Sequence, residues 1–297
     1  MRVAVLGAGT MGHGIAQVSA MAGHDVSLRD VDESVVTDGV ESIDENLRGG
    51  VERGKLTAGE REATLDRIEG TTDLGAAVTD ADLVVEAVPE DVELKRDVLG
   101  EAEEVTPDDA VLASNTSSLP VTEIAAALDA PEQFVGLHFF NPVHVMALVE
   151  VVVAEQTSDE TLAFATEFVE GVEKTPIEVA DAPGFASSRL GVALGVEAMR
   201  MVQEGVAGPR DVDQAMELGY NHPMGPVELG DVVGLDVRLD ILEHLREELG
   251  ERFRPPQILK RKVRAGKLGR KTGEGFYVWE DGEVVGTSGG WDDEVDE

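Results

Sequence analysis

Apolar residues along this chain alternate between short continuous runs and longer segments in which they recur at helical spacing. Residues 2–6 form a run that ends at a glycine, residues 11–21 follow the helical pattern, and residues 25–29 are the next candidate strand. A short apolar run bounded by glycine is typical of a buried strand, whereas recurrence every three to four residues is typical of a helix. The start of the chain is therefore expected to fold as strand, helix and strand.

The alternation continues through the first half of the chain. Further strands are expected at residues 83–87, 110–113, 134–137 and 177–180, and helices at residues 31–53 and 91–103. Thr57 and Glu60 have the Thr-x-x-Glu spacing of a capping box, which indicates that another helix begins there. Strands that alternate with helices predict an α/β fold built on a doubly wound, mainly parallel sheet.

The second half is dominated by helical periodicity. A turn at residues 181–184 follows the last strand, and helices are expected at residues 186–204, 210–218, 227–249 and 257–265, the third of them interrupted at Gly230-Asp231. Pro226 suits the first position of the helix after it. We therefore expect a domain of residues 1–183, an all-α domain of residues 184–285 and an acidic tail of residues 286–297. The last seven residues include five acids and are expected to be disordered.

Composition excludes several classes of protein. The 297 residues include no cysteine, so disulfides, thiolate metal sites and cysteine nucleophiles are excluded, and no metal site is expected. No stretch approaches the ~20 apolar residues of a membrane span, and the first apolar run is too short for a secretory signal. We therefore expect a cytoplasmic protein with no membrane partner.

The charge of the chain is extreme. It has 60 acidic and 24 basic residues, a net charge of −36, and its acids are spread from Asp25 to Glu297. Nucleic acid is not an expected partner, because phosphate backbones are bound by basic faces. A docking face for a basic partner is one explanation of the acids, but their spread favours a solvated surface adapted to a salt-loving cell.

A glycine-rich sequence follows the first strand. Gly7, Gly9 and Gly12 have the G-x-G-x-x-G spacing, with Thr10 and Met11 completing the segment. Gly7 would permit a tight turn, Gly9 would let a pyrophosphate approach, and Gly12 would let the helix pack closely on the strand. The segment therefore predicts a dinucleotide site, and the alternative is an ordinary strand-to-helix turn.

Asp30 stands directly after the second strand, where dinucleotide-binding domains place the carboxylate that binds the adenine ribose. Its negative charge would repel a 2′-phosphate, so NAD is favoured over NADP. Arg29 beside it leaves NADP open, because an arginine at this place can receive that phosphate.

Polar residues follow three further strands, at Glu90, at residues 114–118 and at residues 138–141. Ligands of doubly wound sheets bind beyond the carboxyl ends of the strands, so these residues are expected to face one crevice. His138 is followed twelve residues later by Glu150. A histidine accepts protons near neutral pH and a carboxylate can fix its tautomer, so the pair indicates proton transfer. A histidine satisfied within the core is the alternative.

Basic residues are concentrated near the end of the chain. Seven of the 24 lie among the twelve residues 260–271. Such a cluster should attract phosphates, although for residues 260–264 a solvated helix face or ion pairs with acids are an equal alternative. Lys271 differs from the others because it lies in a glycine-rich loop. His222, in the turn before Pro226, is expected to pack that turn rather than to bind a ligand.

Five segments together resemble the L-3-hydroxyacyl-CoA dehydrogenases. They are Gly7–Ala16, Ser114–Ser118, His138–Pro142, His222–Pro226 and Gly273–Tyr277, in the family's order and spacing. The resemblance extends over roughly residues 1–280 and is strongest to the short, single-function 3-hydroxybutyryl-CoA members.

The resemblance implies an amino-terminal Rossmann-like domain that binds NAD, a helical carboxyl-terminal domain that forms a homodimer, and an active site in the cleft between them. His138 falls on the catalytic histidine, Glu150 on the carboxylate that orients it, and Ser117 and Asn141 on positions that hold substrate and nicotinamide. The cofactor-binding positions correspond to Asp30, Glu90, Lys95 and Lys271, and the coenzyme A contacts to Asn46, Arg53 and Lys55.

The sequence departs from the family at one substrate-binding position. In the family, Pro-Gly-Phe is usually followed by two further residues and then Asn-Arg. This chain has Ser188-Arg189 at that place. A serine keeps a hydrogen bond possible with a shorter reach, so the departure bears on substrate preference and rate more than on reaction type.

The reaction that the resemblance implies is the NAD-dependent interconversion of (S)-3-hydroxyacyl-CoA and 3-oxoacyl-CoA, with His138 as acid and base and short acyl chains as substrates. A sugar-acid dehydrogenase of the same superfamily would use similar motifs and stays open. A non-catalytic NAD-binding sensor or structural protein would need only the glycine-rich segment, and the joint presence of Ser117, His138, Asn141 and Glu150 argues against it.

We predict that folding depends on salt. At molar salt the Debye length falls to ~3 Å, so repulsion among the acids is largely screened, whereas in dilute buffer it destabilises the compact state. Circular dichroism should show a melting temperature that rises steeply with salt concentration. A native and thermally robust spectrum in very dilute buffer would contradict this prediction.

Overall fold

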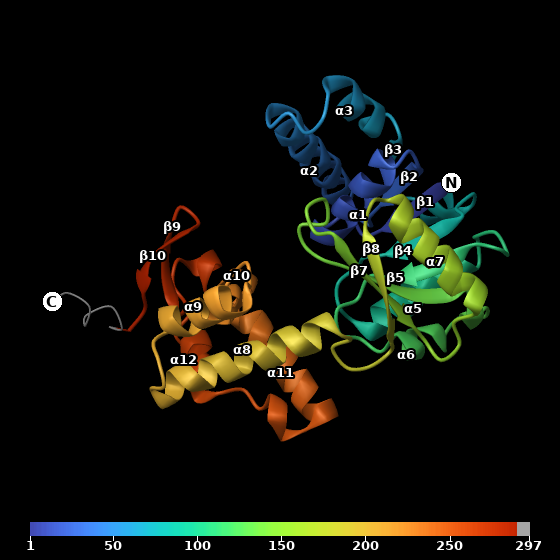
Figure 1. Ribbon diagram of the computed structural model, residues 1–297. Helices are drawn as coiled ribbons and strands as arrows, with labels where there is room; N and C mark the ends of the chain where they lie inside the picture. The colour runs from blue at the N-terminus through green and yellow to red at the C-terminus, as the bar shows by residue number, and fades with distance from the viewer. Residues whose placement is uncertain (290–297) are drawn as a thin grey trace. The chain divides into compact units, whose positions relative to one another are not determined.

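The computed structural model describes residues 1–289, which form two compact units. The first unit is Met1–Phe185 and the second begins at Ala186 (Figure 1). The stretch Trp291–Glu297, for which the sequence predicts disorder, lies outside the described residues. Among residues 1–289, no helix is both long and apolar enough to cross a membrane.

The first unit is built on one eight-stranded sheet with the order β3-β2-β1-β4-β5-β6-β7-β8. Strands β1 to β6 all run in the same direction. Strand β7 is antiparallel to β6 and parallel to β8. This confirms the doubly wound, mainly parallel sheet. The strands are β1 (Arg2–Leu6), β2 (Asp25–Arg29), β3 (Ile68–Thr71), β4 (Leu83–Glu86), β5 (Val111–Ser114), β6 (Phe134–Phe139), β7 (Leu148–Val153) and β8 (Thr175–Ala180).

Helices cover both faces of this sheet, because successive strand residues point to opposite sides. Val3 and Val5 of β1 belong to one buried cluster with Leu47, whereas Ala4 and Leu6 belong to another on the opposite face. The helices are α1 (Thr10–Met21), α2 (Glu33–Glu52), α3 (Ala58–Leu65), α4 (Leu74–Val78), α5 (Val92–Glu103), α6 (Val121–Ala125) and α7 (Asp159–Gly171).

Several elements agree with the sequence prediction and several do not. The capping box at Thr57 and Glu60 is present at the start of α3. Strands β3 and β7 and the helices α4, α6 and α7 were not predicted. Strand β6 continues to Phe139, two residues beyond its predicted end, so His138 lies within the strand rather than after it.

The second unit packs its helices around a core that includes Leu242, Phe253 and Phe276. Its helices are α8 (Ser187–Glu204), α9 (Pro209–Tyr220), α10 (Pro226–Val233), α11 (Leu235–Leu249) and α12 (Gln257–Arg264). The predicted break at Gly230-Asp231 was wrong: both residues are helical, and the chain breaks instead at Gly234, which has a φ of 110° that favours glycine.

The expectation of an all-α second domain also needs correction. Strands β9 (Tyr277–Glu280) and β10 (Glu283–Thr287) form an antiparallel hairpin. Gly286 and Thr287 belong to this hairpin, so the acidic tail does not begin at residue 286. The unit is otherwise helical, as predicted.

Two buried aspartates hold the second unit together. Asp213 of α9 accepts hydrogen bonds from the first backbone N–H groups of α10, at 2.7 and 2.8 Å, and from the Tyr277 hydroxyl at 2.6 Å. Asp231 of α10 accepts from the Tyr277 N–H at 2.9 Å and from Trp279 Nε1 at 3.1 Å. Burial raises the pKa of both carboxyl groups, and these donors oppose that shift. The two carboxylates therefore join α9, α10 and the hairpin.

Each aspartate occupies space that a glycine leaves. A Cβ on Gly225 would lie 2.1 Å from Asp213 Cβ, and a Cβ on Gly275 would lie 2.2 Å from Asp231 Oδ1. This explains the glycines in two of the segments on which the family resemblance rests, because any larger residue would displace a buried carboxylate.

We predict that Gly225→Ala destabilises the second unit by about 1–3 kcal/mol, because the added methyl group overpacks against Asp213. Gly191→Ala is the matched control, since it lies inside α8 and its Cβ would meet no atom within 4 Å. Urea unfolding can be followed by fluorescence, because both tryptophans lie after Ala186. Equal unfolding midpoints for the two variants would contradict the prediction.

Candidate active site

The glycine-rich segment forms the turn between β1 and α1. Gly7 has a φ of 105°, and a Cβ there would lie 2.6 Å from the Ala87 carbonyl oxygen. A Cβ on Gly12 would lie 1.7 Å from the Gly7 carbonyl oxygen, whereas one on Gly9 would meet no atom within 4 Å. Two glycines are therefore needed for the turn itself, and the third leaves open space beside the backbone.

The start of α1 can receive an anion. Its N-cap is Gly9, and no side chain caps the helix. Backbone N–H groups in the first turn of a helix have no partner within the helix, and the helix dipole favours negative charge there. The turn and the helix end thus fit a pyrophosphate.

Asp30 lies beside this turn. Its carboxylate accepts hydrogen bonds from the Ala8 N–H at 2.9 Å and from the Val31 N–H at 2.8 Å. The side chain is half-buried, so part of the carboxylate stays accessible. A carboxylate next to the glycine-rich turn fits ribose hydroxyls and disfavours a phosphate, as expected for NAD. The Arg29 Nε instead donates to the Thr72 carbonyl oxygen at 3.4 Å.

The structure brings together the polar residues that follow β4 and β5. The Glu90 carboxylate accepts from Thr116 Oγ1 at 2.6 Å, from the Ser117 N–H at 2.9 Å and from Ser118 Oγ at 3.3 Å. Glu90 therefore holds the loop that carries Ser117, at the edge of the sheet where ligands of this fold bind.

His138 and Glu150 stand opposite each other on the antiparallel strands β6 and β7. Their side chains are joined by a 2.7 Å contact between His138 Nδ1 and Glu150 Oε2. Since an ionised carboxylate can only accept, Nδ1 donates, and Nε2 is left as the basic nitrogen. Glu150 is fully buried and His138 is 6% exposed. The spacing of twelve residues is thus the geometry of a hairpin.

Aromatic rings and an ordered backbone surround His138. Its ring lies 4.4 Å from that of Phe140 and 5.8 Å from that of Phe185, measured between centroids. The N–H of Phe139 donates to Asn115 Oδ1 at 3.0 Å. These contacts fix the end of β6, and Asn141 follows in the exposed connection to β7.

The resemblance places Lys95 among the cofactor-binding positions, and the structure buries it below the strand ends. Its side chain has no exposed surface, and Nζ lies 2.7 Å from Glu86 Oε1 and 3.4 Å from Glu90 Oε2. The lysine therefore acts beneath the surface of the site. Glu86, also fully buried, was missed by sequence reasoning, although an acid that ends an apolar strand is a signal that could have found it.

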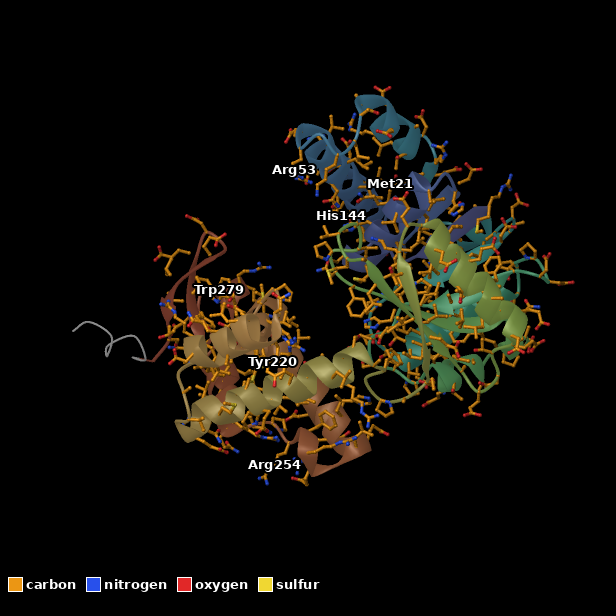
Figure 2. All side chains as sticks on the ribbon, in the orientation of Figure 1. Met21, Arg53, His144, Tyr220, Arg254 and Trp279 are labelled. Carbon is orange, nitrogen blue, oxygen red and sulfur yellow. The ribbon has the colours of Figure 1, made fainter. Side chains whose placement is uncertain are left out.

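The three predicted coenzyme A contacts lie along the end of α2 and the connection after it. Asn46 Nδ2 donates to Gln17 Oε1 at 3.2 Å, whereas Arg53 is the residue that caps α2. Figure 2 shows Arg53 and His144 on the same side of the first unit. Burial and then the positive charges of nearby residues lower the pKa of His144; those residues are Lys174, Arg53, His13 and Lys55. In a strongly acidic chain, this is a local concentration of positive charge.

The remaining predicted site residues belong to the second unit. Ser188 lies in the first turn of α8, and Lys271 Nζ donates to Asp236 Oδ2 at 2.6 Å. The basic cluster at residues 260–271 is largely engaged within its own unit. Lys260 pairs with Glu243 at 2.8 Å, and Lys262 Nζ donates to the Gly275 carbonyl oxygen at 2.6 Å. For these residues, ion pairs and hydrogen bonds replace the phosphate contacts that were one expectation.

Two family models match the chain. The model described as the NAD binding domain of 3-hydroxyacyl-CoA dehydrogenase matches residues 2–182, and the model described as the C-terminal domain of that enzyme matches residues 184–279. Together they span nearly all of the described residues.

Individual proteins are similar over almost the whole chain. The 3-hydroxybutyryl-CoA dehydrogenase of Mycobacterium tuberculosis is 44% identical over 281 residues, which cover 94% of this chain and 98% of that protein. The 3-hydroxybutyryl-CoA dehydrogenase of Clostridioides difficile is 41% identical and covers 93% of this chain and 99% of its own length. The crystal structure of (S)-3-hydroxybutyryl-CoA dehydrogenase PaaH1 from Ralstonia eutropha matches with a TM-score of 0.89 and 39% identity, over 94% of this chain and 99% of that one.

Proposed function

The chain belongs to the 3-hydroxyacyl-CoA dehydrogenase family, an NAD-dependent group of oxidoreductases, and from this premise we propose that it interconverts short-chain (S)-3-hydroxyacyl-CoA and 3-oxoacyl-CoA. The observation that carries the proposal is the 2.7 Å contact between His138 and Glu150 at the ligand-binding edge of the sheet. The names of the relatives support 3-hydroxybutyryl-CoA and acetoacetyl-CoA as the substrate pair.

His138 moves the proton in this proposal. With Nδ1 donating to Glu150, Nε2 can take the proton from the 3-hydroxyl during oxidation and return it to the ketone during reduction. Glu150 orients the ring and stabilises the imidazolium that forms, which matters because the pair is largely shielded from water. Bound NAD supplies the acceptor for the hydride that leaves C3.

Other residues hold the reactants. Ser117 and Asn141 orient the substrate and the nicotinamide, with Glu90 fixing the Ser117 loop. The open space beside Gly9 and the uncapped start of α1 receive the pyrophosphate, and Asp30 receives the ribose. We assign Ser188 to the substrate as well, in place of the usual asparagine.

The acyl carrier is the second part of the proposal. Coenzyme A carries phosphates, and the basic residues around His144 supply the positive charge that such groups need. Arg53 and Lys55 contribute to that charge from the end of α2, and Asn46 lies on the same helix. A sugar acid offers no comparable anionic tail, which favours a coenzyme A thioester.

We further propose a homodimer through the second unit. Helices α8, α9 and α10 expose large apolar side chains in an otherwise highly charged protein, including Leu190, Leu218 and Tyr220, which are 71%, 84% and 75% exposed. These helices pack against one another, so the residues lie on neighbouring elements. The number of large exposed apolar side chains on these three helices supports an interaction surface there. Light scattering should give twice the chain mass of 31.6 kDa, whereas a monomer at all salt concentrations would contradict the proposal.

We predict that His138→Ala lowers kcat with acetoacetyl-CoA and NADH by about 10²–10⁴-fold, because a positioned acid or base contributes a rate factor of that size. Its dissociation constant for NADH, measured by fluorescence, should stay within a few-fold of the wild-type value. Acetoacetate without the thioester is the substrate control and should react far more slowly. Activity of the variant within a few-fold of wild type would overturn the assignment of His138.

Glu150→Gln is the companion variant, and it preserves the size of the side chain while removing its charge. The imidazolium is then less stable. In the oxidation of 3-hydroxybutyryl-CoA by NAD, where His138 must be unprotonated to act as the base, the acid limb of the pH–rate profile should therefore move to lower pH. Turnover should also fall, because the tautomer is no longer fixed. Superimposable profiles for the two enzymes would reduce Glu150 to a packing residue.

A further inference from the structure

A network of buried polar contacts lies beneath the strand ends that carry the proposed site. Its centre is Glu86, the last residue of β4, whose side chain has no exposed surface. It accepts hydrogen bonds from Lys95 Nζ at 2.7 Å, from Ser114 Oγ at 2.5 Å and from the Val88 N–H at 2.7 Å. One carboxylate therefore joins the end of β4 to α5 and to the end of β5.

Lys95 is shared unequally between two carboxylates. Its Nζ lies 2.7 Å from Glu86 Oε1 and 3.4 Å from Glu90 Oε2. It also donates to the carbonyl oxygens of Val88 and Asn115, at 3.3 and 3.4 Å. A buried ammonium pairs most strongly with the closer carboxylate, so Glu86 neutralises most of this charge.

Glu90 is consequently left for other partners. It accepts from Thr116 Oγ1 at 2.6 Å and from the Ser117 N–H at 2.9 Å, and both are closer than Lys95. The side chain of Glu90 is 37% exposed, whereas that of Glu86 has no exposed surface. Glu90 is therefore the carboxylate that a bound cofactor can reach. The position of Glu90 thus depends on how strongly Lys95 is held elsewhere.

We infer that Glu86 is a positioning residue for cofactor binding, which keeps Lys95 away from Glu90 so that Glu90 can hold the Ser117 loop. This inference rests on the proposed function, since it takes Glu90 and Ser117 to face the cofactor. Without the charge of Glu86, Glu90 is the one carboxylate among residues 1–289 that is left to pair with the buried ammonium, and the ammonium draws Glu90 away from its hydrogen bonds to the loop.

The charge of Glu86 depends on the groups that donate to it. Burial raises its pKa, while the Lys95 charge and the hydrogen bonds from Lys95, Ser114 and the Val88 backbone oppose the shift. All of these donors stabilise the ionised form, which is the form that binds Lys95.

The test is a double-mutant cycle read out by KM for NAD. Glu86→Gln should raise KM for NAD about tenfold, the effect expected when one charge-assisted hydrogen bond is lost, while kcat at saturating NAD stays within about threefold. Replacing Lys95 by Met in the same chain removes the ammonium that captures Glu90. The double variant E86Q/K95M should therefore return KM to within about threefold of the wild-type value.

Two further variants separate positioning from stability. Ser114→Ala removes a hydrogen bond to the same carboxylate without changing any charge, so it should lower the melting temperature and leave KM for NAD within about twofold. Glu86→Asp retains the charge and should give a KM nearer to wild type than Glu86→Gln. If Glu86→Gln does not fold, Glu86→Asp carries the test: its shorter side chain should hold Lys95 less closely and raise KM for NAD, and Lys95→Met in the same chain should restore KM.

The inference is overturned if folded Glu86→Gln keeps the wild-type KM for NAD. It is also overturned if Glu86→Gln raises KM equally in the presence and absence of Lys95, or if Ser114→Ala raises KM as much as Glu86→Gln does. A structural defect alone would lower kcat with the folded fraction and leave KM unchanged. Glu90→Gln separates the proposed cofactor role of Glu90 from the positioning role of Glu86. If it leaves KM unchanged, the proposed cofactor role of Glu90 fails; if it raises KM and Glu86→Gln does not, only the present inference fails.

Discussion

A charged side chain is stable in a protein interior only where other groups pair with it or donate hydrogen bonds to it. This constraint shapes both units of the chain. In the first, the Glu86–Lys95 and His138–Glu150 pairs join neighbouring strands and a helix at the ligand-binding edge. In the second, Asp231 joins a helix to the hairpin. Removing one partner would leave a buried charge, so these contacts require the elements to keep their arrangement.

The sequence predicted the elements whose pattern is local. Strands β1 and β2 have the predicted bounds, since glycine bounds the first run and α1 between the two strands shows regular periodicity. Some missed elements, such as β3 and α4, are short, and their apolar residues are too few to show a period. Helix α7 has 13 residues with apolar residues at helical spacing, so the sequence did contain a signal for it. Strand β7 was not predicted at all, and its antiparallel direction depends on contacts between segments that are distant in the sequence.

The same distinction applies to the site. His138 and Glu150 were predicted from residue types. Their pairing across two adjacent strands accounts for the twelve residues between them. Glu86 ends an apolar strand, and that position is a signal of burial. Asp213 was missed for a different reason. In a chain with 60 acidic residues, a buried carboxylate cannot be told from a surface one by composition. The large number of acids in the sequence therefore hides those that lie in the interior.

The hairpin of β6 and β7 sets the distance between His138 and Glu150 independently of the loop that connects the two strands. Strand register sets the distance between His138 and Glu150, while the connecting residues 140–147 lie outside the paired strands. Insertions or substitutions in that connection can therefore change the loop without changing the distance between His138 and Glu150. The loop can vary in length and composition while the pair that we propose for proton transfer keeps its geometry.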